Sequence, residues 1–131
     1  MKQDLPIKQD LALFKAFSDE TRLRILFLLA VRELCVCELV SVLEMPQGKI
    51  SRHLALLKQA GAVGDRRDGT WIYYSLTGSP SALFDRLKPY LESGSPGDDP
   101  LQHDLQRLMS LAEEGVVCVP NPAYTPVTSR N

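Results

Sequence analysis

The sequence feature that most constrains the fold is a helical stripe followed closely by a hairpin signal. In residues 49–59 the apolar side chains recur at positions i, i+4 and i+7, which predicts an amphipathic helix that Ala60-Gly61 ends. These side chains are Ile50, Leu54 and Leu57. Asp68-Gly69 then predicts a two-residue turn, because both central positions of such a turn need positive φ. Residues 71–76 supply aromatic and β-branched side chains for the returning strand.

Helical patterns occupy most of the remaining chain. The first predicted helix covers residues 7–17, and the second has Ser18 as its N-cap and turns Arg22 and Arg24 toward solvent. The other predicted helices run from residue 35 or 36 to 43, over 81–91 and over 101–114. Two short helices joined by a turn and followed by a hairpin have the order of a winged helix-turn-helix. The predicted fold class is therefore mainly α with a small β-hairpin.

Length and composition allow one domain of ordinary size with a hydrophobic core, since the chain has 131 residues of which 44% are hydrophobic. The longest apolar run, residues 25–31, is far too short for a membrane span, and no targeting segment is visible at the N-terminus. Three cysteines without a secretory signal favour reduced thiols in a cytosol over a disulfide framework. We therefore expect a cytoplasmic protein with no membrane partner.

The distribution of charge is more informative than the net charge of −1. Residues 1–84 hold eleven Lys and Arg and nine Asp and Glu, whereas residues 85–131 hold four and seven. Residues 46–72 contain five basic and two acidic side chains, which makes a local basic strip on a nearly neutral protein. The strip is compatible with a nucleic-acid partner, although on charge alone a solvated face is the simpler interpretation.

Four stretches carry a resemblance to a known family. They are 17–26 (FSDETRLRIL), 33–39 (ELCVCEL), 49–57 (KISRHLALL) and 67–76 (RDGTWIYYSL). In this order and register the chain resembles the ArsR/SmtB family of metal-sensing repressors over residues 10–76, about half of its length. The resemblance implies a dimeric winged helix-turn-helix that binds double-stranded operator DNA.

The resemblance and the side-chain chemistry both assign DNA contacts to the 49–59 helix and the hairpin. Polar groups at the start of the helix can hydrogen-bond base edges and phosphates, and the two arginines beside the turn can reach the backbone or the minor groove. The expected DNA-binding residues are Gln47, Lys49, Ser51, Arg52, His53, Arg66, Arg67 and Gly69. The alternatives are an ordinary polar helix surface, ordinary hairpin charges and, for His53, packing beside the apolar stripe.

By the same resemblance, helices 7–17 and 81–91 pair two chains about a twofold axis, which matches a palindromic operator. The apolar residues of both helices would otherwise find little to cover them, unless these helices close the core of a single chain. We expect residues 1–92 to form the DNA-binding and dimerisation domain, 93–114 a linker with an additional helix, and 115–131 an extended tail.

The Cys35-Val36-Cys37 motif is the sharpest chemical feature of the chain. Thiolates are soft ligands, so a close pair selects soft ions over magnesium or calcium. On a regular helix, side chains at i and i+2 diverge by about 200°, because one turn takes 3.6 residues. If both cysteines are helical, one ion binds both sulfurs only when the start of the helix unwinds. Such unwinding would disturb the DNA-reading helix that follows. The alternative is a pair of unremarkable buried cysteines.

The resemblance also limits which ion the cysteines are expected to bind. Arsenite sensors of the family place a third cysteine where this chain has Val40, cadmium- and lead-type members add N-terminal cysteines that residues 1–34 lack, and the zinc-type Asp and His set is absent from 81–91. One further cysteine, Cys118, remains. Three sulfurs suit the trigonal pyramidal geometry of As(III) or Sb(III), so the expected metal ligands are Cys35, Cys37 and Cys118, unless the last is an incidental cysteine of the tail.

The favoured hypothesis is a homodimeric repressor that releases its operator when As(III) or Sb(III) binds, with no resident cofactor. One alternative keeps DNA binding but senses Cd, Pb, Zn or thiol oxidation through the same cysteine pair. A thiol enzyme is disfavoured because no C-x-x-C motif or partnering acid/base set is present. A winged helix that binds protein instead of DNA is the third alternative, which the salt dependence of binding would distinguish.

Overall fold

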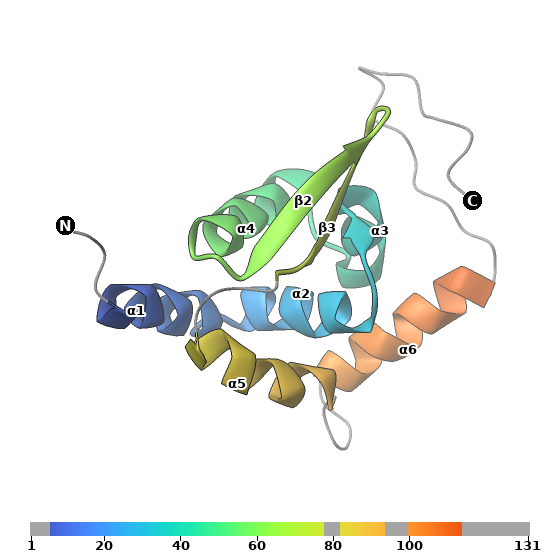
Figure 1. Ribbon diagram of the computed structural model, residues 1–131. Helices are drawn as coiled ribbons and strands as arrows, with labels where there is room; N and C mark the ends of the chain where they lie inside the picture. The colour runs from blue at the N-terminus through green and yellow to red at the C-terminus, as the bar shows by residue number, and fades with distance from the viewer. Residues whose placement is uncertain (1–5, 78–81, 94–99, 114–131) are drawn as a thin grey trace.

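The computed structural model describes residues 6–77, 82–93 and 100–113 (Figure 1). Its elements are α1 (Pro6–Phe17), α2 (Glu20–Val31), β1 (Leu34–Cys35), α3 (Val36–Leu43), α4 (Gln47–Gln59), β2 (Val63–Asp68), β3 (Trp71–Leu76), α5 (Ala82–Glu92) and α6 (Pro100–Glu113). No helix within these ranges is long and apolar enough to cross a membrane. The order of elements confirms the predicted fold class of helices with one small hairpin.

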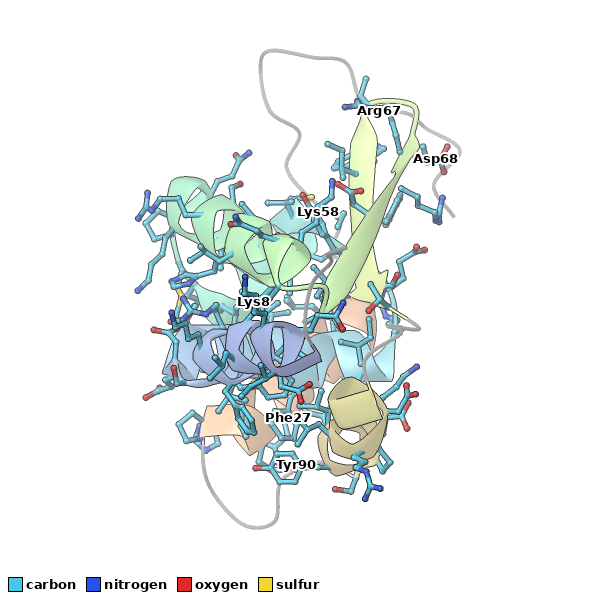
Figure 2. The ribbon with its side chains drawn as sticks, turned by 60° about the vertical axis from the view of Figure 1, so that its left-hand side comes forward. Lys8, Phe27, Lys58, Arg67, Asp68 and Tyr90 are labelled. Carbon is cyan, nitrogen blue, oxygen red and sulfur yellow. The ribbon has the colours of Figure 1, made fainter. Side chains whose placement is uncertain are left out.

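Helix α2 lies at the centre of the fold because it is apolar on several sides. Its consecutive residues 25–29 are all buried, and they form the middle of the main hydrophobic core. Helix α2 contacts α1, α4, α5, α6 and β3. In Figure 1 it separates α5 and α6 on one side from α3, α4 and the hairpin on the other. A short edge-to-face contact between Phe27 and Tyr90, with ring centroids 5.5 Å apart, joins α2 to α5 (Figure 2).

The predicted stripe of α4 is confirmed. Ile50, Leu54 and Leu57 are each 0% exposed, so one face of this helix is fully within the main core. The helix ends at Gly61, whose φ of 85° is the left-handed conformation that glycine adopts without strain. The backbone N–H groups of Gly61 and Ala62 donate to the carbonyls of Lys58 and Leu57, which is the pattern of a Schellman cap.

The hairpin is present, but its turn lies one residue later than predicted. Asp68 pairs with Trp71, so the two-residue loop is Gly69-Thr70, and Asp68 is the last residue of β2. Gly69 has a φ of 66°, which a type II′ turn requires at its first central position. Strand β3 lies between β2 and the two-residue strand β1 in an antiparallel sheet of order β1-β3-β2.

Two expectations for the start of α2 were wrong. The N-cap is Asp19, whose carboxylate accepts a hydrogen bond from the Arg22 N–H at 3.0 Å, while the hydroxyl of Ser18 donates to the Lys15 carbonyl at the end of α1. Arg22 and Arg24 do not simply face solvent. Both are partly buried, because each guanidinium has protein acceptors that the local pattern did not reveal.

Helix α6, the additional helix expected within 93–114, packs on the same core through Leu108. The guanidinium of Arg24 donates two hydrogen bonds of 2.8 Å to Asp104, which is 4% exposed. Arg107 donates to the Ser41 carbonyl and pairs with Glu44, whose φ of 56° makes it the left-handed residue that ends α3. Helix α6 therefore braces both α2 and the turn that leads into α4.

Helix α1 buries one of its faces in the core and leaves another exposed in the single chain. Leu13 and Ala16 face the core, whereas Leu11 and Phe14, together with Ile7, are more than half exposed. These three positions follow i, i+4 and i+7, so they form one apolar stripe on the outside of a single chain.

Candidate nucleic-acid interface and thiol site

The outward face of α4 carries the predicted polar residues. Because the opposite face is fixed in the core, Gln47, Ser51 and Arg52 are exposed and Lys49 is half-buried. Helix α4 begins at Gln47, directly after the N-cap Pro46, so Gln47 lies in its first turn. This rigid row of hydrogen-bonding groups has the chemistry that base edges and phosphates require.

His53 points toward the protein, as in the alternative interpretation. Its Nδ1 lies 3.3 Å from Nη1 of Arg22 and 3.9 Å from the carboxylate of Asp19. A guanidinium can only donate, so Nδ1 is an acceptor and the neutral ring carries its proton on Nε2. Burial is the main reason that the pKa of His53 lies below its usual value, and Arg22, Lys49 and Arg52 lower it further. His53 thus links α4 to the beginning of α2.

The hairpin of β2 and β3, residues 63–76, is called the wing below. Arg67 and Asp68 lie near its tip (Figure 2). Arg67 is exposed, but its neighbour Arg66 is engaged within the protein: it donates two hydrogen bonds of 2.7 Å to Glu33, and its guanidinium lies 4.8 Å from the centre of the Tyr73 ring. Arg67 is therefore the wing arginine better placed to reach a ligand outside the protein.

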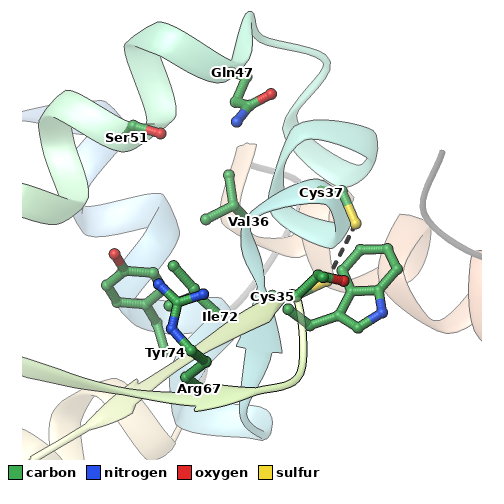
Figure 3. A pocket seen from close by; sticks show the side chains of 10 residues that line it. Cys35, Val36, Cys37, Gln47, Ser51, Arg67, Ile72 and Tyr74 are labelled. Atoms are coloured by element: carbon green, nitrogen blue, oxygen red, sulfur yellow. Dashed lines mark hydrogen bonds between the residues drawn. The ribbon is translucent and has the colours of Figure 1, made fainter. Parts of the chain in front are cut away.

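The two cysteines of the motif lie close together, contrary to the divergence expected for a regular helix. Cys35 is the last residue of β1, with φ −87° and ψ 165°, and only Cys37 belongs to α3. Because the backbone changes direction between them, the sulfur atoms are 3.3 Å apart (Figure 3). The carboxylate of Glu38 accepts the Cys35 N–H at 2.9 Å and so fixes this junction. No unwinding is needed to bring the sulfurs together.

A cavity of about 410 Å³ connects the cysteine motif with the polar groups of α4 and the wing. Cys35 and Cys37 line it together with Gln47 and Ser51 of α4 and Arg67 of β2 (Figure 3). Val36 projects into it from the first turn of α3. The structure thus brings into one cavity residues that the sequence assigned separately to metal binding and to DNA binding.

The third expected ligand, Cys118, lies outside the described residues. Among the residues that the structure does describe, no three His, Cys, Asp or Glu side chains are grouped as a metal site would need. Among the described cysteines Cys35 is a thiol and Cys37 is disulfide-bonded, so the pair can bind an ion only after reduction.

Several residues of the site were not found from the sequence. Trp71 and Tyr73 form a small buried cluster with Cys35, apart from the main core, and Cys37 packs against it. Glu33 holds Arg66 across 33 positions of sequence. The aromatic and β-branched residues of β3 indicated a strand, but nothing local indicated that this strand covers the cysteines.

Fold and site together define a winged helix-turn-helix regulator. A family model described as "Bacterial regulatory protein, arsR family" matches residues 19–64. The arsenic resistance transcriptional regulator ArsR2 of Pseudomonas putida is 49% identical over 84 residues, which cover 63% of this chain and 73% of that protein. The chain belongs to the ArsR family, which confirms the resemblance. The family consists of regulators and not of enzymes.

Two further relatives match over a shorter span. The arsenic resistance transcriptional regulator ArsR1 of Pseudomonas putida is 56% identical over 64 residues, 48% of this chain and 50% of that protein. The arsenical resistance operon repressor of Escherichia coli is 51% identical over 74 residues, 56% of this chain and 60% of that protein. The chain thus spans about half to three fifths of the length of these two relatives.

A solved structure from Mycobacterium bovis supports the fold. It is described as a homodimeric winged helix-turn-helix DNA-binding domain of a possible ArsR-family transcriptional regulator. It shares 26% sequence identity with this chain at a TM-score of 0.57, and the match covers 83% of this chain and 85% of that one.

Proposed function

We propose that the chain is a homodimeric transcriptional repressor that binds a palindromic operator and releases it when As(III) or Sb(III) binds cysteine thiolates. One observation carries the proposal: Cys35 and Cys37, with sulfurs 3.3 Å apart, line the same cavity as Gln47, Ser51 and Arg67. An effector bound there lies beside the groups that contact DNA, so the two ligands can influence one another.

The number of sulfurs favours a pyramidal ion. Three sulfurs suit trigonal pyramidal As(III) or Sb(III), whereas a tetrahedral zinc site needs a fourth ligand that the expected set lacks. We assign the third ligand to Cys118, from the same chain or its partner.

The DNA-binding role rests on α4 and the wing. Gln47, Lys49, Ser51 and Arg52 lie on the outward side of a helix whose inner face is buried, and Arg67 extends the basic surface onto the wing. His53 contacts Arg22 and the exposed Arg66 pairs with Glu33 beside this surface, and Gly69 permits the tight turn at its edge. The homodimeric domain from Mycobacterium bovis supports a twofold arrangement.

The proposed dimer covers the outer stripe of α1. Ile7, Leu11 and Phe14 are 60%, 52% and 56% exposed in the single chain, which is unusual for three apolar side chains in one row. Burial of this stripe between two chains would remove it from water. A C₂ dimer also presents two copies of α4, which a palindromic operator matches.

The decisive experiment measures DNA affinity with and without arsenite. The reduced protein selects a duplex from a random-sequence pool, and fluorescence anisotropy then gives its dissociation constant. We expect saturating arsenite to weaken binding at least five- to tenfold, within the usual range of allosteric coupling. Cys35→Ser and Cys37→Ser are expected to bind DNA normally and to ignore arsenite. Unchanged affinity of the wild type at saturating arsenite would eliminate the effector role and leave the fold intact.

Three further measurements test the third ligand, the identity of the effector and the binding of DNA. Cys118→Ser is the control for the third ligand, because undiminished arsenite affinity in this variant removes only that assignment. Release by peroxide or cadmium as readily as by arsenite would favour the thiol-oxidation or soft-metal sensor. Affinity that falls steeply as salt rises is expected of phosphate contacts and would exclude a protein-binding winged helix.

A further inference from the structure

The cysteine motif belongs to the sheet of the wing as well as to α3. Cys35 is a strand residue, and β1 pairs antiparallel with β3 so that Cys35 lies opposite Tyr73 and Leu34 opposite Tyr74. Strand β3 in turn pairs with β2 along its whole length. A change in the backbone of Cys35 is therefore transmitted to the wing through one step of strand pairing.

The side chains make the same connection. Cys35, Trp71 and Tyr73 form a buried cluster of their own, and Cys37 packs against it. Trp71 is the first residue of β3, directly after the turn. An ion that binds both sulfurs must lie next to this cluster, so its ligand geometry acts first on the aromatic side chains that support the wing.

A third connection links the segment before Cys35 to strand β2. Glu33, two residues before Cys35, accepts two hydrogen bonds from Arg66, and Arg66 lies over the ring of Tyr73. Arg66 and Tyr73 are also directly opposed in the strand pairing. The segment that carries Cys35 is thus tied to both strands of the wing.

Helix α4 shares the cavity with the cysteines through Gln47 and Ser51, but other parts of the fold hold it in place. It follows the opposite end of α3 from Cys37, and its inner face is fixed by three fully buried side chains and by the contact of His53 with Arg22. The turn between α3 and α4 is held by Arg107 of α6. Regions with few buried contacts move at lower free-energy cost than regions within the core.

We infer that effector binding at Cys35 and Cys37 weakens DNA binding by displacing the wing, while α4 keeps its position. This inference rests on the proposed function and specifies how the same site is regulated. Tyr73, Trp71 and the Glu33–Arg66 pair are positioning residues, and Arg67 is the contact that is lost when the effector binds.

The test compares two basic side chains, one on each element. The measured quantity is the ratio of the DNA dissociation constants with and without arsenite, for the wild type, Arg67→Ala and Lys49→Ala. Both variants should bind DNA more weakly. If the wing carries the effect, the ratio falls several-fold toward 1 in Arg67→Ala and keeps its wild-type value in Lys49→Ala, because the coupling free energy depends only on contacts that differ between the two states.

Two other outcomes of this experiment would count against the inference. A wild-type ratio retained in Arg67→Ala, or reduced equally in both variants, overturns the inference and leaves the proposed function standing. A ratio of 1 in the wild type removes the proposed function and the inference with it.

A second pair of variants tests the connection itself. Glu33→Gln breaks the link between the cysteine segment and β2, whereas Asp65→Asn breaks the link between Lys58 of α4 and the same strand, in which Nζ lies 3.0 Å from the carboxylate. Fluorescence of Trp71, the single tryptophan, reports arsenite binding. We expect equal arsenite affinity in both variants and a reduced ratio only in Glu33→Gln. An unreduced ratio in Glu33→Gln would contradict a role for this pair.

Discussion

Helix α4 and the wing expose similar polar groups, but the rest of the molecule holds them in different ways. Helix α4 has one face in the main core and is supported by α2 directly and by α6 through the turn before it. The base of the wing joins the main core through Val63, whereas the rest of the wing is supported by a small aromatic cluster over Cys35 and by ion pairs of Arg66 with Glu33 and of Asp65 with Lys58. A rigid element fixes where the protein reads DNA, whereas a loosely held element beside a ligand site is suited to change.

A substitution in the buried face of α4 should cost more stability than any other change considered for this protein. Leu54→Ala removes a fully buried side chain of α4 and should lower the free energy of unfolding by about 2–5 kcal/mol. Leu56→Ala is the matched control on the same helix, since Leu56 is 48% exposed and should cost less than about 0.5 kcal/mol. Denaturant unfolding at equal protein concentration measures both, and similar losses would mean that the inner face does not hold α4.

The next prediction concerns the ion pair between Arg24 of α2 and Asp104 of α6. Asp104→Ala leaves the partly buried guanidinium of Arg24 without its two short hydrogen bonds and should cost about 2 kcal/mol. Glu20→Ala is the control, because this exposed carboxylate lies 3.8 Å from the same guanidinium and should contribute less than about 0.5 kcal/mol. Thermal unfolding of the two variants compares them, and an equal shift would contradict the role assigned to α6.

A smaller loss of stability is expected when the contact between Glu33 and the wing is removed. Glu33→Gln should change the free energy of unfolding by less than about 1 kcal/mol, because Arg66 and Glu33 are exposed to solvent screening. It should nevertheless accelerate amide hydrogen exchange in β2, whereas exchange in α4 stays at the wild-type rate. Exchange that accelerates equally in both elements would mean that they open together.

Features that depend on local sequence patterns could be predicted from the sequence. The stripe of α4 is a local pattern, so Ile50, Leu54 and Leu57 were correctly assigned to the core. The hairpin was correct to within one residue, since Asp68-Gly69 and Gly69-Thr70 both place a glycine in the turn. Ser18 and Asp19 are both good N-cap residues, and local preference does not separate neighbours.

Non-local contacts account for what could not be predicted. Strand β1 has two residues and exists because β3 pairs with it, so the extended backbone of Cys35, and with it the sulfur separation, depends on residues almost 40 positions away. Arg24 was assigned to solvent because its partner Asp104 is 80 positions distant. Helix α6 joins the main core through Leu108, which is also far from the other core residues in sequence.

The weakest effect that we predict is a pH dependence of stability that comes from His53 of α4. In the folded protein the pKa of His53 is lowered, chiefly by burial and also by Arg22, Lys49 and Arg52, although Asp19 opposes the shift. The unfolded chain therefore binds a proton more readily than the folded chain as pH falls below the ordinary histidine value of about 6.5. The stabilisation is complete above that pH and is lost as pH falls through the lowered pKa.

His53→Gln tests this dependence, because glutamine retains an acceptor for Arg22 but does not titrate in this range. The slope of unfolding free energy against pH between about 5 and 6.5 should decrease in this variant. Since protonated Nδ1 would face the guanidinium of Arg22, the wild type should also lose DNA affinity over this interval and His53→Gln should not. Equal pH profiles for wild type and His53→Gln would show that this contact does not hold α4 in place.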